Sequence, residues 1–292
     1  MTIGWAGGGR PALIVHGGAG ADPADAPDEL REGMRAAVAA GWAVLDRGGS
    51  ALDAVEAAVR VLEDHPRFNA GRGSVLTSEG TVEMDASIME GDRLGNGACA
   101  AVTGIRNPIS LARRILDADR HSLFVGAGAV ARARALGIAS CDPAELITDR
   151  RRARMAPQPG TVGAAALDES GTLAAATSTG GTHGKLPGRV GDSALIGCGT
   201  YAHSGRGAVS CTGDGEAIIR AVLARRSVDL LAAGGDPASA CRLAVDLLVR
   251  EGRGQGGLIM LDPLGRVGWA QSTALMPVGL RRPGDAGPVV PF

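Results

Sequence analysis

The sequence predicts an α+β fold in which antiparallel strands and helices pack in layers. Strand candidates come in adjacent pairs joined by short turns, and amphipathic helix patterns are gathered between groups of strands. Glycine is abundant, with 46 copies among 292 residues, which indicates many tight turns and close backbone contacts. A regular alternation of single strands and helices would instead favour a doubly wound parallel sheet.

The N-terminal part of the chain predicts one strand and two helices. Residues 12–15 form a short apolar run, and a helical pattern of apolar residues covers about 28–45. A second helix is expected to start behind Ser50, whose hydroxyl is a good N-cap, and to end before Pro66. Residues 68–76 are expected to form a loop that leads into a strand.

The middle of the chain predicts two strands around one helix, followed by a linker. The strands are expected at 98–103 and 122–126, and the helix begins at Pro108, directly behind Asn107. Residues 150–160 are basic and then rich in proline, without an apolar period, which is typical of an exposed linker.

The C-terminal part contains the clearest hairpin signal. Residues 161–167 and 173–177 flank the turn Asp168-Glu-Ser-Gly171, which has the polar and glycine residues of a tight connection. The remaining elements are expected to be a strand at 208–212, helices at 216–225 and 237–250, and a hairpin made of 257–262 and 265–270.

Composition excludes several classes of protein. Lys and Arg total 30 and Asp and Glu total 31, so the chain lacks the basic excess that nucleic-acid binding requires. Hydrophobic residues make up 45% and charged residues 21%, which excludes a disordered chain. Aromatic residues make up only 2%, so stacking platforms for bases or sugars are not expected.

The chain is expected to be a cytoplasmic protein without a membrane segment. Its N-terminus lacks the basic and apolar regions of a signal peptide, and no uncharged apolar run approaches the roughly 18 residues of a membrane span. The cysteines are odd in number and far apart, without disulfide or zinc spacing, which favours a reducing compartment: Cys99, Cys141, Cys198, Cys211 and Cys241.

Common catalytic and nucleotide-binding motifs are missing. The sequence has no G-x-S-x-G nucleophile elbow, no phosphate-binding P-loop and no paired histidines with zinc spacing. Gly252, Gly254 and Gly257 match a dinucleotide pattern but precede a strand instead of a helix. The basic run 150–154 fits either a contact for acidic partners or, more simply, a solvated linker.

Hydroxyl residues beside glycines are concentrated in the second half of the chain. One such cluster would be an ordinary strand end followed by a turn, but four of them at strand ends point to a nucleophile and an oxyanion hole. The clusters are residues 160–163, 177–181, 188–193 and 210–215.

Thr161 is the candidate nucleophile. A threonine hydroxyl needs a base, and no suitably placed histidine is evident. If the chain were cut between Gly160 and Thr161, the new α-amine, with a reference pKa of about 7.7–8.0, could take the hydroxyl proton itself.

The ordered set of motifs resembles the plant-type asparaginase / isoaspartyl peptidase family, a branch of the N-terminal-nucleophile hydrolases. The resemblance covers nearly the whole chain. Its motifs are IVHGGAG (14–20), FNAGRGSV (68–75), EMDASIM (83–89), TVGA (161–164), AAATSTGG (174–181), KLPGRVGDS (185–193) and TGDGE (212–216).

The resemblance implies a four-layer αββα sandwich and a chain, 1–292, that cuts itself into subunits 1–160 and 161–292. The usual assembly is a dimer of such αβ units. The implied activity is hydrolysis of L-asparagine and of β-aspartyl dipeptides, without a catalytic cofactor. Glycosylasparaginase activity on the same fold, or an uncleaved binding module, would be the alternatives.

The resemblance also implies roles for the residues of the site. Thr161 would be the nucleophile, Thr179 would hydrogen-bond it and assist cleavage, and Asn69 would lie beside it. Thr212 and the N–H of Gly213 would form the oxyanion hole.

Three further positions would bind the substrate. Arg189 would hold the α-carboxylate, and Asp192 and the Gly215 carbonyl would bind the α-ammonium. Taken alone, the spacing of Arg189 and Asp192 favours a simple surface ion pair, and Asn69 could simply stabilise a turn.

A structural sodium ion is implied on the loop before and after Asn69. Its ligands would be main-chain carbonyls, and an ordinary helix end is the alternative interpretation. The positions are Leu62, Glu63, His65, Phe68, Ala70 and Arg72.

The chain departs from the family pattern in three places. The linker before Thr161 is short, residues 182–184 replace a bulkier segment beside the substrate entrance, and Asp214 adds a negative charge between the two binding glycines. These departures concern the rate of cleavage and the choice of substrate.

Overall fold

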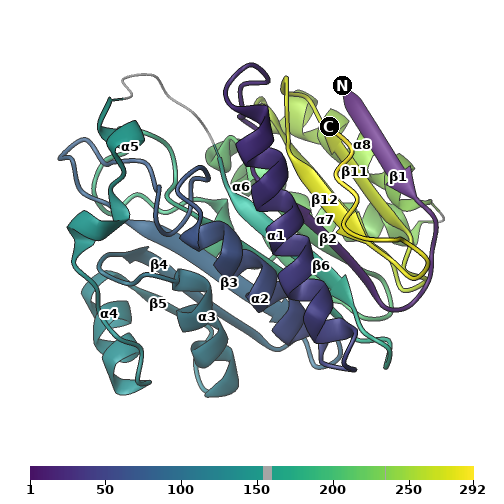
Figure 1. Ribbon diagram of the computed structural model, residues 1–292, viewed down its shortest axis with the longest axis horizontal. Coiled ribbons are helices and arrows are strands. Elements are labelled where there is room, and N and C mark those ends of the chain that lie inside the picture. Colours follow the sequence, from purple (N-terminus) through teal and green to yellow (C-terminus); the bar gives the residue numbers. More distant parts are fainter. Residues whose placement is uncertain (154–159, 234) are drawn as a thin grey trace.

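The computed structural model describes residues 1–153, 160–233 and 235–292, and it has two β-sheets (Figure 1). The larger sheet has seven strands in the order β12-β2-β6-β7-β3-β4-β5, and the smaller has five in the order β1-β11-β10-β9-β8. Every pairing is antiparallel except β4 with β5, as the paired strand signals predicted. The strands are β1 Thr2–Ala6, β2 Ala12–His16, β3 Met84–Glu90, β4 Asn96–Val102, β5 Leu123–Val125, β6 Val162–Leu167, β7 Leu173–Thr179, β8 Thr200–His203, β9 Gly207–Gly213, β10 Gly256–Leu261, β11 Val267–Gln271 and β12 Val278–Arg281.

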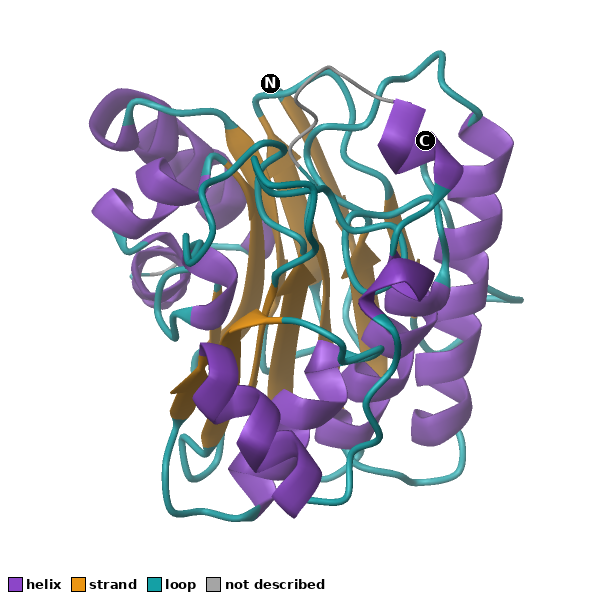
Figure 2. Ribbon diagram, turned by 90° about the vertical axis from the view of Figure 1, so that its left-hand side faces the viewer, coloured by secondary structure: helices purple, strands orange, loops and turns teal. Residues whose placement is uncertain are grey.

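Helices lie on both sides of the strands (Figure 2). The larger sheet contacts α1, α2, α3 and α4, whereas the smaller sheet contacts α7 and α8. The helices are α1 Pro27–Leu45, α2 Ala51–Asp64, α3 Pro108–Asp117, α4 Gly126–Ala135, α5 Asp149–Ala153, α6 Gly215–Ala221, α7 Leu223–Ala232 and α8 Pro237–Leu247. None of the helices within the described residues is long and apolar enough to cross a membrane.

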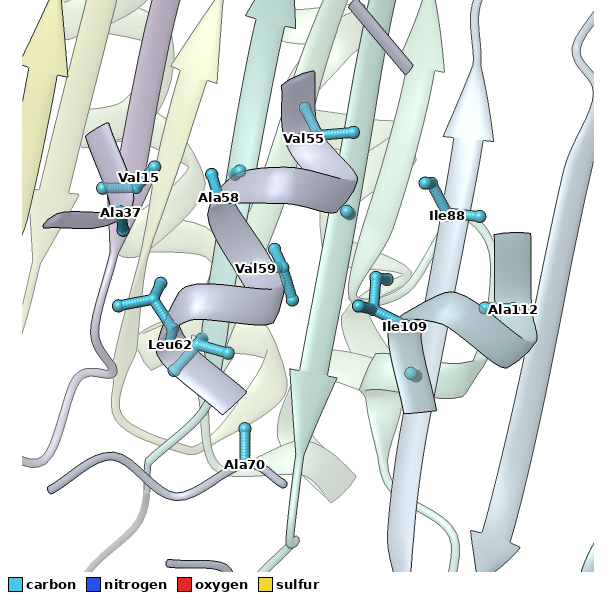
Figure 3. Packing of buried hydrophobic residues seen from close by; sticks show 14 of the residues in the cluster. Val15, Ala37, Val55, Ala58, Val59, Leu62, Ala70, Ile88, Ile109 and Ala112 are labelled. Atoms are coloured by element: carbon cyan, nitrogen blue, oxygen red, sulfur yellow. The ribbon is translucent and has the colours of Figure 1, made fainter. Parts of the chain in front are cut away.

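Side chains point alternately to the two faces of each strand, and this divides the core into separate layers. In β2, Leu13 and Val15 pack with the helices, whereas Ala12 and Ile14 face the other sheet. Successive side chains of a strand point to opposite faces, so one strand contributes to both layers. Figure 3 shows the helix side of this core, where Leu62 of α2 lies among small and branched side chains.

Local sequence signals explain where α2 and α8 begin. Ser50 accepts a hydrogen bond from the N–H of Asp53, 3.1 Å away, so it caps α2 as expected. Asp236 caps α8 through Ser239 in the same way. Asn107 precedes Pro108 but forms no side-chain cap; its amide instead donates to Asp64.

Three expectations about secondary structure were wrong. Residues 68–76 form turns and no strand. The helix expected at 216–225 is divided by Val222, whose φ of 48° interrupts the helical backbone between α6 and α7. Residues 149–153 are helical instead of an exposed linker, and Arg151 is buried; residues 154–159 of that linker lie outside the described part of the chain.

The strands β1, β3, β8 and β12 were not predicted. In β3 all seven residues are buried, so the alternation of polar and apolar residues that signals a half-exposed strand is missing. Two of its polar members, Asp85 and Ser87, can be buried because they form hydrogen bonds inside the protein.

Truncating a buried leucine of the helix layer should destabilise the fold far more than truncating an exposed one. Leu111 of α3 is fully buried, and Leu243 of α8 is 42% exposed. We expect Leu111→Ala to lower the free energy of unfolding by about 2–5 kcal/mol because it leaves a cavity, and Leu243→Ala by less than about 1 kcal/mol. Urea unfolding of both variants checks this, and equal losses would contradict the assigned core.

Candidate active site

Thr161 lies directly before β6, near the middle of the larger sheet, and is 4% exposed. The hairpin of β6 and β7 brings it beside Thr179, the last residue of β7. The hydroxyl of Thr161 donates to Oγ1 of Thr179 at 3.2 Å. The hairpin, which the sequence predicted, is therefore the element that joins these two threonines.

The carbonyl of Gly160 accepts two side-chain hydrogen bonds. The hydroxyl of Thr179 donates to it at 2.9 Å, and Nδ2 of Asn69 donates to it at 2.8 Å. Two donors on one carbonyl oxygen stabilise any negative charge that develops there, as in an oxyanion hole. The Gly160–Thr161 peptide thus has a polarised carbonyl next to the hydroxyl of Thr161, the candidate nucleophile.

Asn69 is held in place by every polar atom of its side chain. Its Nδ2 also donates to the carbonyl of Gly181 at 2.7 Å, and its Oδ1 accepts from the N–H of Val75 at 2.9 Å. The main-chain carbonyl of Asn69 accepts from Gly180 at 3.0 Å. These contacts use both the donor and the acceptor of the amide and orient its Nδ2 toward Gly160.

Thr212 approaches from the other sheet, in β9. Its Oγ1 accepts a hydrogen bond from the N–H of Ala19 at 3.0 Å, so its own proton remains available to donate. The turn that carries Ala19 packs on the nucleophile, because a Cβ at Gly18 would lie 2.8 Å from the nitrogen of Thr161. Gly18 has a φ of 104°, which also favours glycine.

Arg189 forms a two-point ion pair with Glu216 at the start of α6. Nε and Nη2 of Arg189 each lie 2.9 Å from one carboxylate oxygen of Glu216. The pair uses one side of the guanidinium and leaves Nη1 at its far end. Arg189 therefore does not pair with Asp192 on the surface, the simpler alternative for these two residues.

Asp192 is 4% exposed, and its Oδ2 has no hydrogen-bond partner within the described residues. Burial raises the pKa of this carboxyl to about 7, although the nearby charge of Arg189 opposes the shift. An unpaired buried carboxylate is costly unless a cation binds to it. Asp192 is thus prepared to receive a positively charged group.

One small cavity is shared by most of the predicted residues. Its volume is about 10 Å³, which is room for roughly one water molecule. A Cβ at Gly215 would lie 2.7 Å from Nη2 of Arg189 and 3.0 Å from Oδ1 of Asp192, so glycine is needed there to keep the space. The cavity is lined by Gly160, Thr161, Thr179, Gly181, Thr182, Arg189, Asp192, Gly213 and Gly215.

Two carboxylates that support the site received no role from the sequence. Asp85 is fully buried and accepts from the N–H groups of Ala101 and Gly191, both at 2.9 Å, which fixes the segment before Asp192. Glu216 is the partner of Arg189. Both residues belong to the sequence motifs given above. The feature that could have pointed to them is a charged residue placed next to glycines or apolar residues.

The loop 62–72 has main-chain groups that fit a cation. Phe68 and Ala70 are buried, yet their carbonyls accept no hydrogen bond from the described residues. The carbonyls of Glu63 and His65 each accept only one, from Arg72 and Phe68, at 2.7 and 3.2 Å. Unpaired buried carbonyls are ligands that hard cations prefer. No group of three or more His, Cys, Asp or Glu side chains within the described residues could hold a metal.

Other sequence features lie outside this cavity. The carboxylate of Asp214 accepts from the N–H of Gln255 at 2.7 Å, so it bonds to the segment before β10, and it does not line the cavity. Gly257 lies in β10, which agrees with the view that the glycine pattern there opens no helix.

Comparison with known proteins identifies the family. The family model described as Asparaginase matches residues 9–158 and 153–287. An isoaspartyl peptidase/L-asparaginase from Danio rerio is 43% identical over 274 residues, covering 89% of this chain and 88% of that protein. The corresponding protein of Homo sapiens is 43% identical over 271 residues, covering 88% of each chain.

An archaeal relative is similar over an even larger share of its length. A plant-type L-asparaginase from Pyrococcus abyssi is 43% identical over 309 aligned positions, covering 94% of this chain and 99% of that protein. The matches span both sheets and every element that contributes to the cavity. The chain therefore belongs to the asparaginase family.

Proposed function

We propose that the chain is a threonine amidohydrolase that hydrolyses L-asparagine to L-aspartate and ammonia and cleaves β-aspartyl dipeptides, after cutting itself between Gly160 and Thr161. The observation that carries this proposal is the pair of hydrogen bonds from Asn69 and Thr179 to the Gly160 carbonyl, next to the Thr161 hydroxyl. The names of the relatives support the choice of substrates.

Self-cleavage begins when Oγ1 of Thr161 attacks the carbonyl carbon of Gly160. As that bond forms, the Thr161 proton passes to Oγ1 of Thr179, and Thr179 gives its own proton to the Gly160 oxygen. Collapse breaks the C–N bond, and the proton that returns goes to the nitrogen, leaving an ester between Gly160 and Oγ1 of Thr161. Water then hydrolyses the ester, and the α-amine and hydroxyl of Thr161 are both free.

Turnover uses the same hydroxyl with a different base. The new α-amine of Thr161 takes the proton of Oγ1, which attacks the side-chain carbonyl carbon of the substrate. The hydroxyl of Thr212 and the N–H of Gly213 stabilise the oxyanion. The proton passes to the leaving nitrogen, ammonia or an amine departs, and water resolves the β-aspartyl ester.

The charges around the cavity suit the two ends of an amino acid. Nη1 of Arg189, with the outer N–H of Nη2, fits an α-carboxylate as a two-point clamp. The unpaired Asp192 carboxylate and the Gly215 carbonyl fit an α-ammonium. A cavity of about 10 Å³ does not admit asparagine, so the uncut chain is expected to be inactive until cleavage opens the site.

The remaining features of the proposal follow from the family. We propose that the helices and sheets described above form the four-layer αββα sandwich of N-terminal-nucleophile hydrolases, as one domain, 1–292, that is divided by cleavage. A sodium ion on the carbonyls of loop 62–72 would fix the loop that carries Asn69 and would take no part in the chemistry. We further propose a dimer of αβ units in the cytoplasm.

Cleavage should depend on the two donors at Gly160. Wild-type protein should give fragments of 160 and 132 residues on denaturing electrophoresis, and Thr161→Ala none. Asn69→Ala removes one donor and should slow cleavage about 100- to 1000-fold. The control is Asn96→Ala, because Asn96 only bonds a nearby exposed carbonyl. Unchanged cleavage in Asn69→Ala would exclude this role.

Substrate binding should depend on the planar guanidinium of Arg189. We expect Arg189→Lys to raise KM for L-asparagine about 10- to 100-fold with little change in kcat, since the clamp acts on a group remote from the reaction. Arg226→Lys, at an exposed ion pair with Glu251, is the control.

A preference for N-glycosylated asparagine over both predicted substrates would favour glycosylasparaginase activity instead.

The raised pKa of Asp192 should make this residue costly for stability. Folding raises the pKa from 3.8 to about 7, so the native state holds the proton more tightly and stability falls as pH rises between these values. In the uncleaved Thr161→Ala chain, Asp192→Asn should add about 1–4 kcal/mol to the unfolding free energy at pH 8 and little near pH 4.

Urea unfolding at the two pH values measures this difference. The control is Asp28→Asn, because the Asp28 side chain is 97% exposed and should show no such pH dependence. If the Thr161→Ala chain has the same unfolding free energy at pH 8 with Asp192 as with Asn at this position, burial imposes no cost on the carboxylate.

A further inference from the structure

A row of polar side chains crosses the larger sheet one level below the nucleophile. His16, Gly163, Thr177 and Ser87 are successive ladder partners on β2, β6, β7 and β3. All four residues are fully or almost fully buried. The row therefore runs at right angles to the strands, in the space between the two sheets.

The smaller sheet presents a matching pair. Ser210 of β9 and Thr200 of β8 are ladder partners, and both are fully buried. They lie between the side chains of the first row, so the contacts alternate from one sheet to the other. We call His16, Ser210, Thr177, Thr200 and Ser87 the inter-sheet polar row.

Short hydrogen bonds join the members of this row. Nε2 of His16 lies 2.8 Å from Oγ of Ser210, which lies 2.7 Å from Oγ1 of Thr177. Oγ1 of Thr200 lies 2.5 Å from Oγ1 of Thr177 and 2.8 Å from Oγ of Ser87. Each of these four bonds connects the larger sheet to the smaller one.

The far end of the row reaches the substrate-binding segment. The hydroxyl of Ser87 donates its proton to the carbonyl of Ser193, 2.6 Å away. Ser193 follows Asp192 directly, so the row extends from the strand before the Gly18 turn to the residue beside the buried carboxylate.

Gly163 leaves the space that the row occupies. A Cβ at this position would overlap Oγ of Ser210 and lie 2.6 Å from Nε2 of His16. Gly163 has an ordinary φ, so the requirement is for space and not for backbone freedom. The close approach of the two sheets is thus built into β6, two residues after Thr161.

His16 is a neutral ring in this setting. Burial lowers its pKa to about 3, although a contact with the main chain of Thr161 acts in the opposite direction. Its Nδ1 has no hydrogen-bond partner within the described residues, whereas a charged ring would need an acceptor on both nitrogens. The row therefore consists of uncharged groups at any pH near neutrality.

The inter-sheet polar row lies directly beside the threonines of the candidate active site. Thr161, Thr179 and Thr212 stand two residues from Gly163, Thr177 and Ser210 along the same strands, and so on the same faces. Thr161 and Thr179 belong to the larger sheet and Thr212 to the smaller. Hydrogen bonds between the sheets, unlike apolar packing, fix their separation in a directional way.

We propose that His16 is a positioning residue: as an uncharged ring it completes the inter-sheet polar row and thereby sets the distance between the nucleophile Thr161 and the oxyanion donor Thr212. An apolar layer would hold the sheets together without burying five polar groups, as it does at the neighbouring level around Ile14 and Ile259. This inference rests on the proposed function, because Thr212 acts only in turnover.

The proposed role of His16 affects the rates of self-cleavage and of substrate turnover differently, although Thr161 is the nucleophile in both. Self-cleavage needs Thr161, Thr179 and Asn69, which all belong to the side of the larger sheet, whereas turnover also needs Thr212 from the smaller sheet. Loosening the row should thus affect kcat much more than self-cleavage. A merely structural role would affect both alike, through the amount of folded protein.

The test compares His16→Phe, Ser210→Ala and the double variant with wild type. We expect each single variant to cleave itself within about threefold of the wild-type rate and to lose about 10- to 100-fold in kcat for L-asparagine, with KM within about twofold. The double variant should be no worse than the poorer single variant, because both changes break the same bond. His16→Gln, which keeps a polar atom near the position of Nε2, should restore part of kcat.

The control is Ile259→Val, which weakens apolar packing between the same sheets without touching the row. It should lower stability while leaving kcat unchanged. Equal losses of kcat in Ile259→Val and His16→Phe, or additive losses in the double variant, would overturn the proposal.

Nuclear magnetic resonance gives a readout that does not depend on the substrate. In the uncleaved Thr161→Ala chain, the ring nitrogens of His16 should show one neutral tautomer from pH 5 to pH 9, and Ser210→Ala should shift the signal of Nε2. Titration of His16 near pH 6.5 would overturn the proposal. Failure of wild-type protein to hydrolyse asparagine would instead contradict the proposed function, and the spectrum would still decide on the row.

Discussion

The structure depends on the position of one peptide carbonyl, that of Gly160, between the amide of Asn69 and the hydroxyl of Thr179. The two donors come from distant parts of the sequence: Asn69 from the loop after α2, and Thr179 from the end of β7. The β6–β7 hairpin and the hydrogen bonds of Asn69 to its own loop bring both to the same oxygen. The residue that follows this carbonyl is Thr161, whose hydroxyl bonds to Thr179.

A second constraint is that the site is divided between two sheets. The nucleophile and its neighbour lie on the larger sheet, and Thr212, Gly213 and the segment leading to Gly215 lie on the smaller. Polar groups must therefore be buried where the sheets meet, which costs stability unless each group finds a partner. Most do, and the Asp192 carboxylate, which lacks a partner on Oδ2, is the group that a substrate ammonium would satisfy.

Local patterns in the sequence were sufficient for much of the fold. The cap at Ser50, the proline at the start of α3 and the turn before β7 act through neighbouring residues, so they can be read from the sequence. The strand β3 could not, because it is buried on both faces and carries Asp85 and Ser87, whose partners are distant in sequence. The break at Val222 likewise has no local signal, since a branched residue rarely adopts a positive φ.

The site followed the same division. The hydroxyl and glycine clusters indicated segments that meet at one cavity, and the family resemblance supplied expected roles for individual residues. Neither could reveal that Glu216 already holds one side of Arg189, or that His16 meets Ser210 across the sheets, because both contacts arise from tertiary structure alone.

The most direct test of the account follows one freshly made sample over time and measures, in each aliquot, the intact mass and the rate of asparagine hydrolysis. We expect activity to be absent from the uncut chain and to rise in strict proportion to the amount of the fragment that begins with Thr161. Full activity in a sample that still consists of the intact chain would contradict it.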